Sequence, residues 1–195
     1  MGTYYEWVAD LDATEADAPE LARRVVEALV ARKVILPELS PDAALGADGY
    51  PAGPAWADTV DVSVSGESPW GVEVRVGREV HNGAQIGVDA VTCPRCSVRR
   101  EFYGPPEEFG PTCTDDEGLR WFDDAAAVWR EGGEADLECR TCGAVAPVTE
   151  WQADGAALAR LGFVFWGWDE LRADVPRWIA EATGGHRVVN GRGKI

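Results

Sequence analysis

The sequence predicts an α+β fold, in which a mixed or antiparallel sheet carries helices on one face and an inserted zinc-ribbon module with four cysteines. Both ends of the chain alternate strand and helix patterns, and two Cys-x-x-Cys pairs lie between them. The predicted parts are the first half of the core, the module and the second half of the core, at residues 1–92, 93–150 and 151–195.

The first half of the core begins with a predicted strand, because residues 3–11 are rich in aromatic and β-branched side chains. Asp17 and Pro19 then open a helix, since aspartate accepts hydrogen bonds from free amides and proline suits the first turn. The apolar stripe of this helix consists of Leu21, Ala22, Val25, Val26, Leu29 and Val30. We expect the helix to end before Pro37, and the prolines and glycines of residues 37–58 predict a long loop.

Two alternating runs follow, at residues 59–65 and 70–77, and each places its valines on one face. A Gly-Glu-Ser-Pro turn separates them, so the pair predicts a β-hairpin. His81, Asn82 and Gly83 predict a further turn, after which residues 85–91 lead as a strand into the first cysteine pair.

Within the module, Thr114 and Glu117 form a Thr-x-x-Glu capping box and predict the start of a helix. Its apolar residues at helical spacing are Leu119, Phe122, Ala126 and Trp129, and Gly132 ends it. The second cysteine pair lies in a predicted hairpin over residues 136–151.

The second half of the core opens with a predicted buried strand at residues 159–168. Asp174 then caps a short helix with Pro176 in its first turn. The apolar stripe of this helix consists of Val175, Trp178, Ile179 and Ala182, and residues 186–189 predict a last strand.

The cysteine spacing predicts a structural zinc site. Tetrahedral zinc needs four thiolates at about 2.3 Å, and a two-residue gap lets one tight turn offer two of them. The predicted zinc ligands are Cys93, Cys96, Cys139 and Cys142. Gly143 suits the residue after the second cysteine, which often takes a positive φ, and Ser97 suits it less well. For Cys113 we expect a free or half-buried thiol, with replacement of one zinc ligand as the alternative.

Other cysteine chemistries fit less well. Five cysteines and the lack of a secretion signal disfavour a disulfide framework. Residues after Cys96 have a strand pattern, whereas a thioredoxin-like redox pair lies at a helix N-terminus. A zinc deaminase needs His-x-Glu, but His81 is followed by Asn82 and Gly83.

No catalytic constellation is visible in the sequence. His81 and His186 are its two histidines, and neither has a spacing that identifies a partner, so we expect structural roles for both. Acidic clusters are interpreted as solvated helix faces. We therefore assign no catalytic or cofactor-binding residue and favour a non-catalytic protein, while leaving an enzyme open.

The net charge of −16, from 18 basic and 34 acidic residues, repels nucleic-acid phosphates and anionic membranes and attracts cationic partners. Residues 93–150 alone hold 13 acidic and 6 basic residues. Four arginines near the cysteines nevertheless leave nucleic-acid binding open, since zinc ribbons often contact nucleic acid there: Arg95, Arg99, Arg100 and Arg140.

We expect a cytoplasmic protein that does not enter membranes. The N-terminus lacks the basic and apolar regions of a signal peptide. The longest apolar stretch, at residues 161–168, is far too short to span a bilayer.

The end of the chain resembles an uncharacterised group of bacterial proteins over residues 162–195, with the paired Cys-x-x-Cys upstream as support. The shared patterns are a Phe-Trp-x-Trp strand and a closing His-Arg-Val-Val and Gly-Lys-hydrophobic end, here Phe165–Trp168, His186–Val189 and Gly193–Ile195. The resemblance implies a shared fold and no activity, so it assigns no catalytic residues.

Three functional hypotheses follow. The favoured one is a non-catalytic interaction protein, which binds a basic protein partner as immunity or inhibitor proteins do. The alternatives are a nucleic-acid-associated zinc-ribbon accessory factor and an enzyme of unrecognised type, whose site lies beside the C-terminal pattern.

Overall fold

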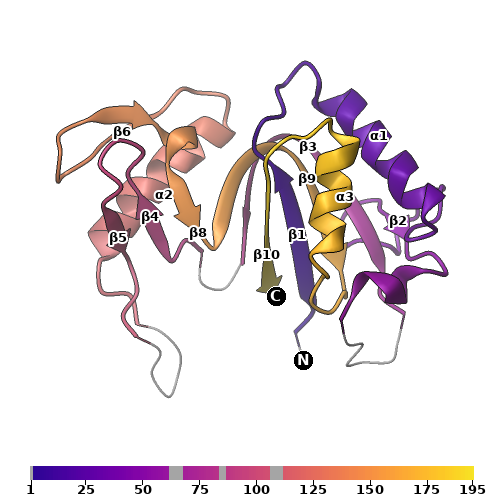
Figure 1. Ribbon diagram of the computed structural model, residues 1–195. Helices are drawn as coiled ribbons and strands as arrows, with labels where there is room; N and C mark the ends of the chain where they lie inside the picture. Colours follow the sequence, from indigo (N-terminus) through magenta and orange to yellow (C-terminus); the bar gives the residue numbers. More distant parts are fainter. Residues whose placement is uncertain (1, 62–67, 84–86, 106–111) are drawn as a thin grey trace.

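The computed structural model describes residues 2–61, 68–83, 87–105 and 112–195, which form an α+β fold with two lobes (Figure 1). The helices are α1 (Ala18–Ala31), α2 (Asp116–Arg130) and α3 (Asp174–Ala182). The strands are β1 (Tyr4–Asp10), β2 (Tyr50–Pro51), β3 (Gly71–Asn82), β4 (Ala90–Thr92), β5 (Arg99–Glu101), β6 (Asp136–Glu138), β7 (Val145–Pro147), β8 (Gln152–Asp154), β9 (Ala156–Trp166) and β10 (Val188–Lys194).

The larger lobe is built on a five-stranded sheet in the order β10-β1-β9-β3-β2, and every neighbouring pair is antiparallel. The sheet is therefore the antiparallel form of the two that the sequence predicts. β9 is buried along nearly its whole length, as its apolar sequence suits a central strand. Both ends of the chain meet in this sheet, because β1 pairs with β9 on one side and with β10 on the other.

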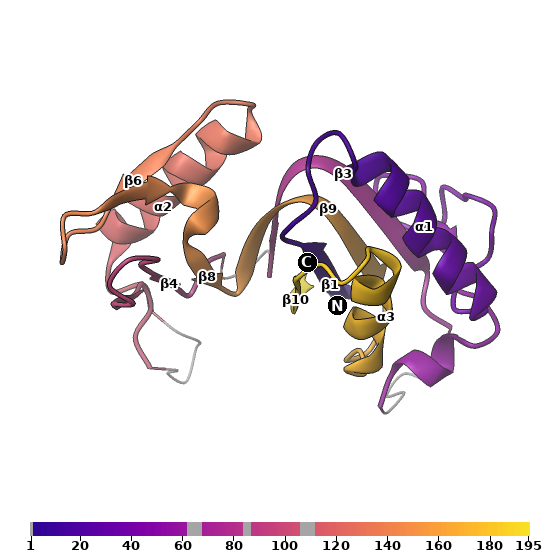
Figure 2. The same ribbon diagram turned by 45° about the horizontal axis from the view of Figure 1, so that its top comes forward.

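Helices α1 and α3 both cover one face of this sheet, as predicted (Figure 2). Their apolar stripes face the sheet because residues at helical spacing share one side of a helix. The core between helices and sheet includes Val25, Leu29, Val175, Ile179, Val8, Phe163 and Phe165. Each such fully buried side chain stabilises the fold by about 1.5–3 kcal/mol.

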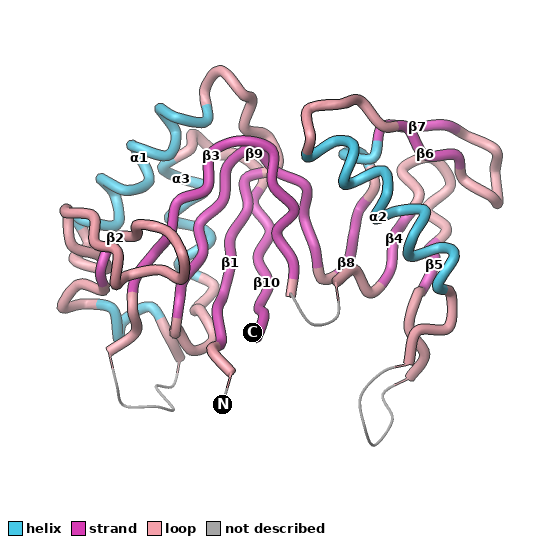
Figure 3. The backbone as a smooth tube through the Cα atoms, turned by 180° about the vertical axis from the view of Figure 1, so that it is seen from behind, coloured by secondary structure: helices cyan, strands magenta, loops and turns pink. Residues whose placement is uncertain are grey.

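The smaller lobe contains α2, the three-stranded sheet β5-β4-β8 and the hairpin β6-β7. Its core is separate from that of the larger lobe. It comprises Val88, Val91, Cys93, Phe102, Phe122, Ala126, Trp129, Leu137, Cys139, Ala146, Val148, Trp151, Ala156 and Leu158. Helix α2 lies across the strands of this lobe and supplies large aromatic side chains to its core (Figure 3).

Strands β3 and β9 connect the two lobes. Their pairing shifts between Val76 and Glu79, where Gly77 has a φ of +120° and forms a bulge. Beyond the bulge, the same two strands continue toward the smaller lobe, where Ala156 and Leu158 join its core. The lobes are therefore joined by continuous paired backbone rather than by a linker.

Two predicted helix caps lie one residue from their expected positions. Asp115, rather than Thr114, caps α2, because its side chain accepts a hydrogen bond from the amide of Gly118. The Thr114 hydroxyl instead lies 3.3 Å from the carbonyl of Phe102. Asp174 is the first residue of α3 and not its cap, which is Ala173.

Residues 62–67 of the predicted hairpin over residues 59–77 lie outside the described residues. The second predicted run lies in β3, which pairs with β2 and β9. At the start of the predicted hairpin, Trp56–Thr59 form a 3₁₀ turn and Val60 makes an isolated bridge to Leu171. Among the described helices, none has the length and apolar character that crossing a membrane requires.

Candidate metal centre

The fold brings the two cysteine pairs together. The Sγ atoms of Cys93, Cys96, Cys139 and Cys142 all lie within 4.8 Å of one another. Sγ of Cys93 is 4.0 Å from that of Cys142, and Sγ of Cys96 is 3.7 Å from that of Cys139. Four sulfurs around one zinc ion at about 2.3 Å would be about 3.8 Å apart. The cluster therefore fits a single tetrahedral metal ion, and it joins parts of the chain that are far apart in sequence.

Each cysteine pair lies in a tight turn, and the two turns have the same backbone geometry. Ser97 donates its amide to the carbonyl of Cys93 at 3.0 Å, and Gly143 donates to Cys139 at 2.8 Å. Ser97 has a φ of +58° and Gly143 a φ of +70°, so both adopt the left-handed conformation. Glycine does so without strain, whereas Ser97 costs about 1 kcal/mol or more. Ser97 keeps this conformation because the turn requires it.

The pKa values of two thiols of the cluster, Cys139 and Cys96, are shifted in opposite directions. The backbone amide of Cys142, aided by that of Thr141, lowers the pKa of Cys139 to about 6. The amide of Val98 acts in the same sense on Cys96, but burial and the other three sulfurs outweigh it and raise the pKa of Cys96 to about 12. Four thiolates repel one another, and a dication among them removes that repulsion.

Cys113 lies apart from this cluster. Among the described residues, the group of four cysteines does not include it. It forms an isolated bridge with Tyr103 and its side chain is half-buried. Its place fits the expected half-buried thiol rather than a metal ligand.

The four arginines near the cysteines all contact acidic side chains of the same lobe or of its junction with β9. The pairs are Arg95–Glu150 at 2.7 Å, Arg99–Glu101 at 3.3 Å, Arg99–Asp154, Arg100–Asp115 at 2.5 Å and Arg140–Glu117 at 2.6 Å. Arg100 is the most buried of the four, and it lowers the pKa of the Asp115 carboxyl that caps α2. Their charge is therefore compensated within the protein.

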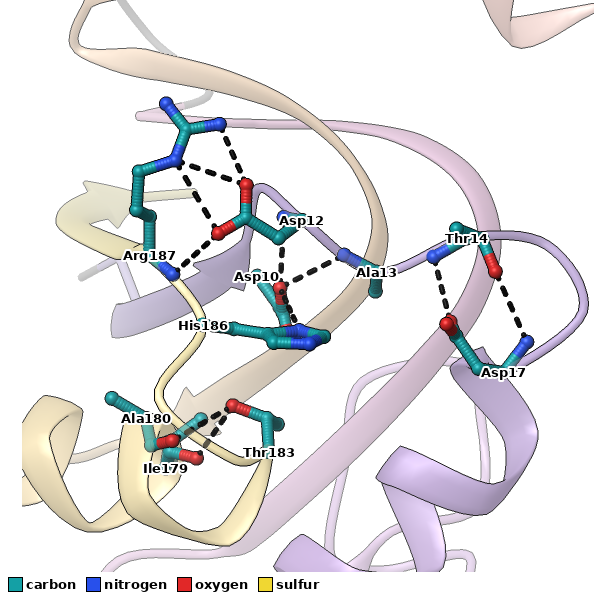
Figure 4. Close-up of polar contacts among 10 residues, drawn as sticks. All are labelled: Asp10, Asp12, Ala13, Thr14, Asp17, Ile179, Ala180, Thr183, His186 and Arg187. Carbon is teal, nitrogen blue, oxygen red and sulfur yellow. Dashed lines mark hydrogen bonds and ion pairs between the residues drawn. The ribbon is translucent and has the colours of Figure 1, made fainter.

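His186 contacts a buried carboxylate at the end of β1 (Figure 4). Its Nδ1 lies 2.9 Å from Oδ2 of Asp10, a residue with no exposed surface. Asp10 also accepts hydrogen bonds from the amides of Asp12 and Ala13. Arg187 binds the carboxylate of Asp12, so the start of β10 is fixed to the end of β1 by two adjacent pairs.

The nearby hydroxyl of Thr183 is directed away from this histidine. It lies 3.1 Å from the carbonyl of Ile179 and 3.0 Å from that of Ala180, so its proton points to α3 (Figure 4). The Asp10–His186 pair joins the end of β1 to the segment just before β10, and it gives His186 a partner that sequence spacing does not identify.

His81 lies inside β3 rather than in the predicted turn. β3 continues through Asn82 because both residues pair with β9, His81 with Ala157 and Asn82 with Ala156. His81 is 2% exposed, and its imidazole lies 6.1 Å from the ring of Trp7. A lone histidine in the sequence gives no signal of this environment, because the contact joins β3 to β1.

Comparisons of the chain with protein-family models, curated proteins and solved structures find no match. The resemblance of residues 162–195 to a bacterial group therefore stays a prediction. The function has to be argued from the chemistry of the residues themselves.

Proposed function

We propose that this protein is a non-catalytic, zinc-stabilised binding protein that acts through contact with a basic protein partner, in the manner of immunity or inhibitor proteins. The compensated charge of the four arginines near the cysteines carries this proposal. Once these arginines are paired, the charge that the module offers to a partner is negative.

Zinc as the metal is supported by the donor set. Four thiolates in tetrahedral spacing suit zinc, or iron in a site of the same geometry. Cys93 and Cys139 are buried in the core of the smaller lobe, which places the ion where it would join two turns. A structural role of the ion and a reducing compartment such as the cytoplasm both agree with five cysteines that form no disulfide.

Exposed acidic side chains just after α2 and along β6 form the surface that we propose for binding. Glu131, Glu134, Asp136 and Glu138 are all exposed. Along residues 136–139, in β6 and just after it, the exposed acids alternate with the buried Leu137 and Cys139, because successive residues of an extended chain point to opposite faces. A lysine- or arginine-rich surface would be steered toward this strand by long-range attraction.

Binding to a basic probe tests the proposal. Biolayer interferometry would compare lysozyme with its succinylated form, whose charge is reversed, at about 50 mM and about 500 mM NaCl. We expect binding only to native lysozyme, with an affinity that falls at high salt. The double variant Asp136→Asn/Glu138→Gln should weaken binding about tenfold, the effect of losing two charges near a partner.

A matched control separates a binding surface from net charge. The double variant Glu15→Gln/Glu38→Gln also removes two negative charges, but from exposed positions on the larger lobe. Equal weakening by both double variants would contradict a surface on β6. Binding of duplex DNA as tight as that of lysozyme would instead support the nucleic-acid alternative.

A further inference from the structure

The sheet face opposite α1 and α3 carries aromatic side chains around a cavity. Val8 packs under the helices, so its neighbour Trp7 points to the other face. Tyr5 and Trp166 lie on this same face, with ring centroids 5.0 Å apart. A cavity of about 230 Å³ opens among these rings and His81. It is separate from the cysteine cluster and from β6.

Glycines in neighbouring strands make room for these rings. Trp7 is paired with Gly191 and Tyr5 with Gly193, both on β10. A Cβ atom on Gly191 would lie 2.4 Å from Cζ2 of Trp7, and one on Gly193 would lie 2.2 Å from Cζ of Tyr5. The rings of Trp7 and Tyr5 therefore lie directly over the backbone of β10, and the Tyr5 ring is tilted by 44° from that of Trp166.

A glycine also makes room for the imidazole of His81. A Cβ atom on Gly162 would lie 2.1 Å from Cε1 of His81. The bulge in β3 turns the end of that strand over the sheet, so that His81 covers Gly162 and faces Trp7. His81 and Trp7 both line the cavity.

Several polar groups beside the cavity have protein partners. Nε1 of Trp166 donates to Glu73 at 2.9 Å. Arg75 donates to both oxygens of the same carboxylate, at 2.8 and 3.0 Å, and the Tyr5 hydroxyl donates to the carbonyl of Asn82 at 2.8 Å. The Glu73–Arg75 ion pair at the cavity is therefore compensated within the described part of the chain.

Three ring nitrogens are exceptions. Nε1 of Trp7 and both nitrogens of His81 are shielded from solvent and have no hydrogen-bond partner among the described residues. Leaving a buried polar atom unpaired costs about 1–3 kcal/mol. Burial, reinforced by Arg75, also lowers the pKa of His81 to about 4, so the ring is neutral and offers one donor and one acceptor.

We propose that this cavity binds an uncharged, planar heteroaromatic molecule of about the size of a nucleobase. Such a ligand stacks against these rings, and a small rotation of the Trp7 and His81 side chains on binding lets Trp7 donate a hydrogen bond to it and His81 exchange one with it. The volume equals that of roughly eight liquid waters, which suits one or two fused rings. An anionic ligand is disfavoured, because Glu73 neutralises Arg75, the basic residue of the described lining.

Calorimetric titration of the zinc-loaded full chain tests this site. The probes are adenine, cytosine and nicotinamide as neutral rings, and benzoate and benzamidine as charged rings. We expect at least one neutral probe to bind with a Kd below about 1 mM, and both charged probes to bind at least about tenfold more weakly. Absence of binding by every neutral probe up to about 5 mM would mean that the cavity holds water only, and would overturn the proposal.

The variant Trp7→Phe keeps an aromatic ring and removes the N–H donor. It should weaken the best neutral probe about tenfold, the effect of losing one hydrogen bond to a buried donor. Trp70→Phe, at a 41% exposed tryptophan outside the cavity lining, should change the affinity less than about twofold. Equal effects of the two variants would overturn the proposal.

A measurement on the unaltered protein covers the case in which Trp7→Phe fails to fold. The assigned indole N–H signal of Trp7 is followed by NMR during titration with the best neutral probe. We expect this signal to shift downfield as the bond forms, while that of Trp70 stays in place. A Trp7 signal that does not move at saturation would contradict the proposed contact.

Discussion

The buried imidazole of His81 makes the folded protein sensitive to acid. Its pKa is lowered from 6.5 to about 4, so between these values the unfolded chain binds a proton that the folded chain does not. The penalty is absent above pH 6.5 and grows as the pH falls toward 4, to about 3 kcal/mol at most. We expect His81→Gln to lose less unfolding free energy between pH 6.5 and 4.5 than the unaltered protein, as measured by urea denaturation. Parallel curves for the two proteins would contradict this.

Glu6 has the opposite pH dependence. Burial, reinforced by Glu170 and Asp169 and opposed by Arg192, raises the pKa of Glu6 from 4.5 to about 7. Its protonated form stabilises the fold fully below pH 4.5, and this contribution, at most about 3 kcal/mol, is lost as the pH rises through 7.

We therefore expect Glu6→Gln to reduce the loss of unfolding free energy between pH 5 and pH 8, again by urea denaturation. Glu15→Gln, at an exposed position, is the control and should leave the slope unchanged. Because the contributions of His81 and Glu6 oppose each other between pH 4.5 and 6.5, single variants reveal them better than the unaltered protein does. A Glu6→Gln slope equal to that of the control would show that Glu6 does not titrate in this range.

At the level of elements, β10 is shaped by the rings that cross it. Gly191→Ala should destabilise the protein by about 1–3 kcal/mol, because its Cβ atom would overlap Trp7. The cost should fall below about 1 kcal/mol in a Trp7→Leu background, since the smaller side chain leaves room. Chemical denaturation of the four proteins of this cycle measures the coupling, and additive effects would contradict the contact.

The elements that the sequence predicts well are those whose geometry is local. Each cysteine turn is specified by a few neighbouring residues, and the helices follow from apolar periodicity. The cap of α2 differs by one residue because two neighbouring side chains can fill the same role: Asp115 caps the helix, while Thr114 contacts Phe102.

Pairings between distant strands are not predictable in the same way. β9 lies between β1 and β3, and Trp7, Val164 and Glu73 become neighbours across three strands. The cavity beside Trp7 depends on such pairings, so a single sequence cannot reveal it. Its one local signal is the alternation of Gly191 and Gly193 in a strand, which marks close approach of other side chains.

At the scale of the whole molecule, two separate cores share the strands β3 and β9. The core of the larger lobe is closed by α1 and α3 and includes none of the cysteines. That of the smaller lobe includes Cys93 and Cys139. The metal is therefore expected to stabilise the smaller lobe, and its loss should leave the larger lobe folded.

Removing the metal tests this division. We expect one zinc ion per chain by mass spectrometry of the metal content, and Cys139→Ser should lose the ion and lower the melting temperature of the smaller lobe by about 10 °C or more. Hydrogen exchange should then show lost protection in α2 and β6 but retained protection in α1, because only the former pack on the cysteine turns. Cys113→Ser is the matched control and should keep both the ion and the protection, since Cys113 lies outside the cluster. Uniform loss of protection in both lobes of the Cys139→Ser protein would show that the shared strands make the two cores a single cooperative unit.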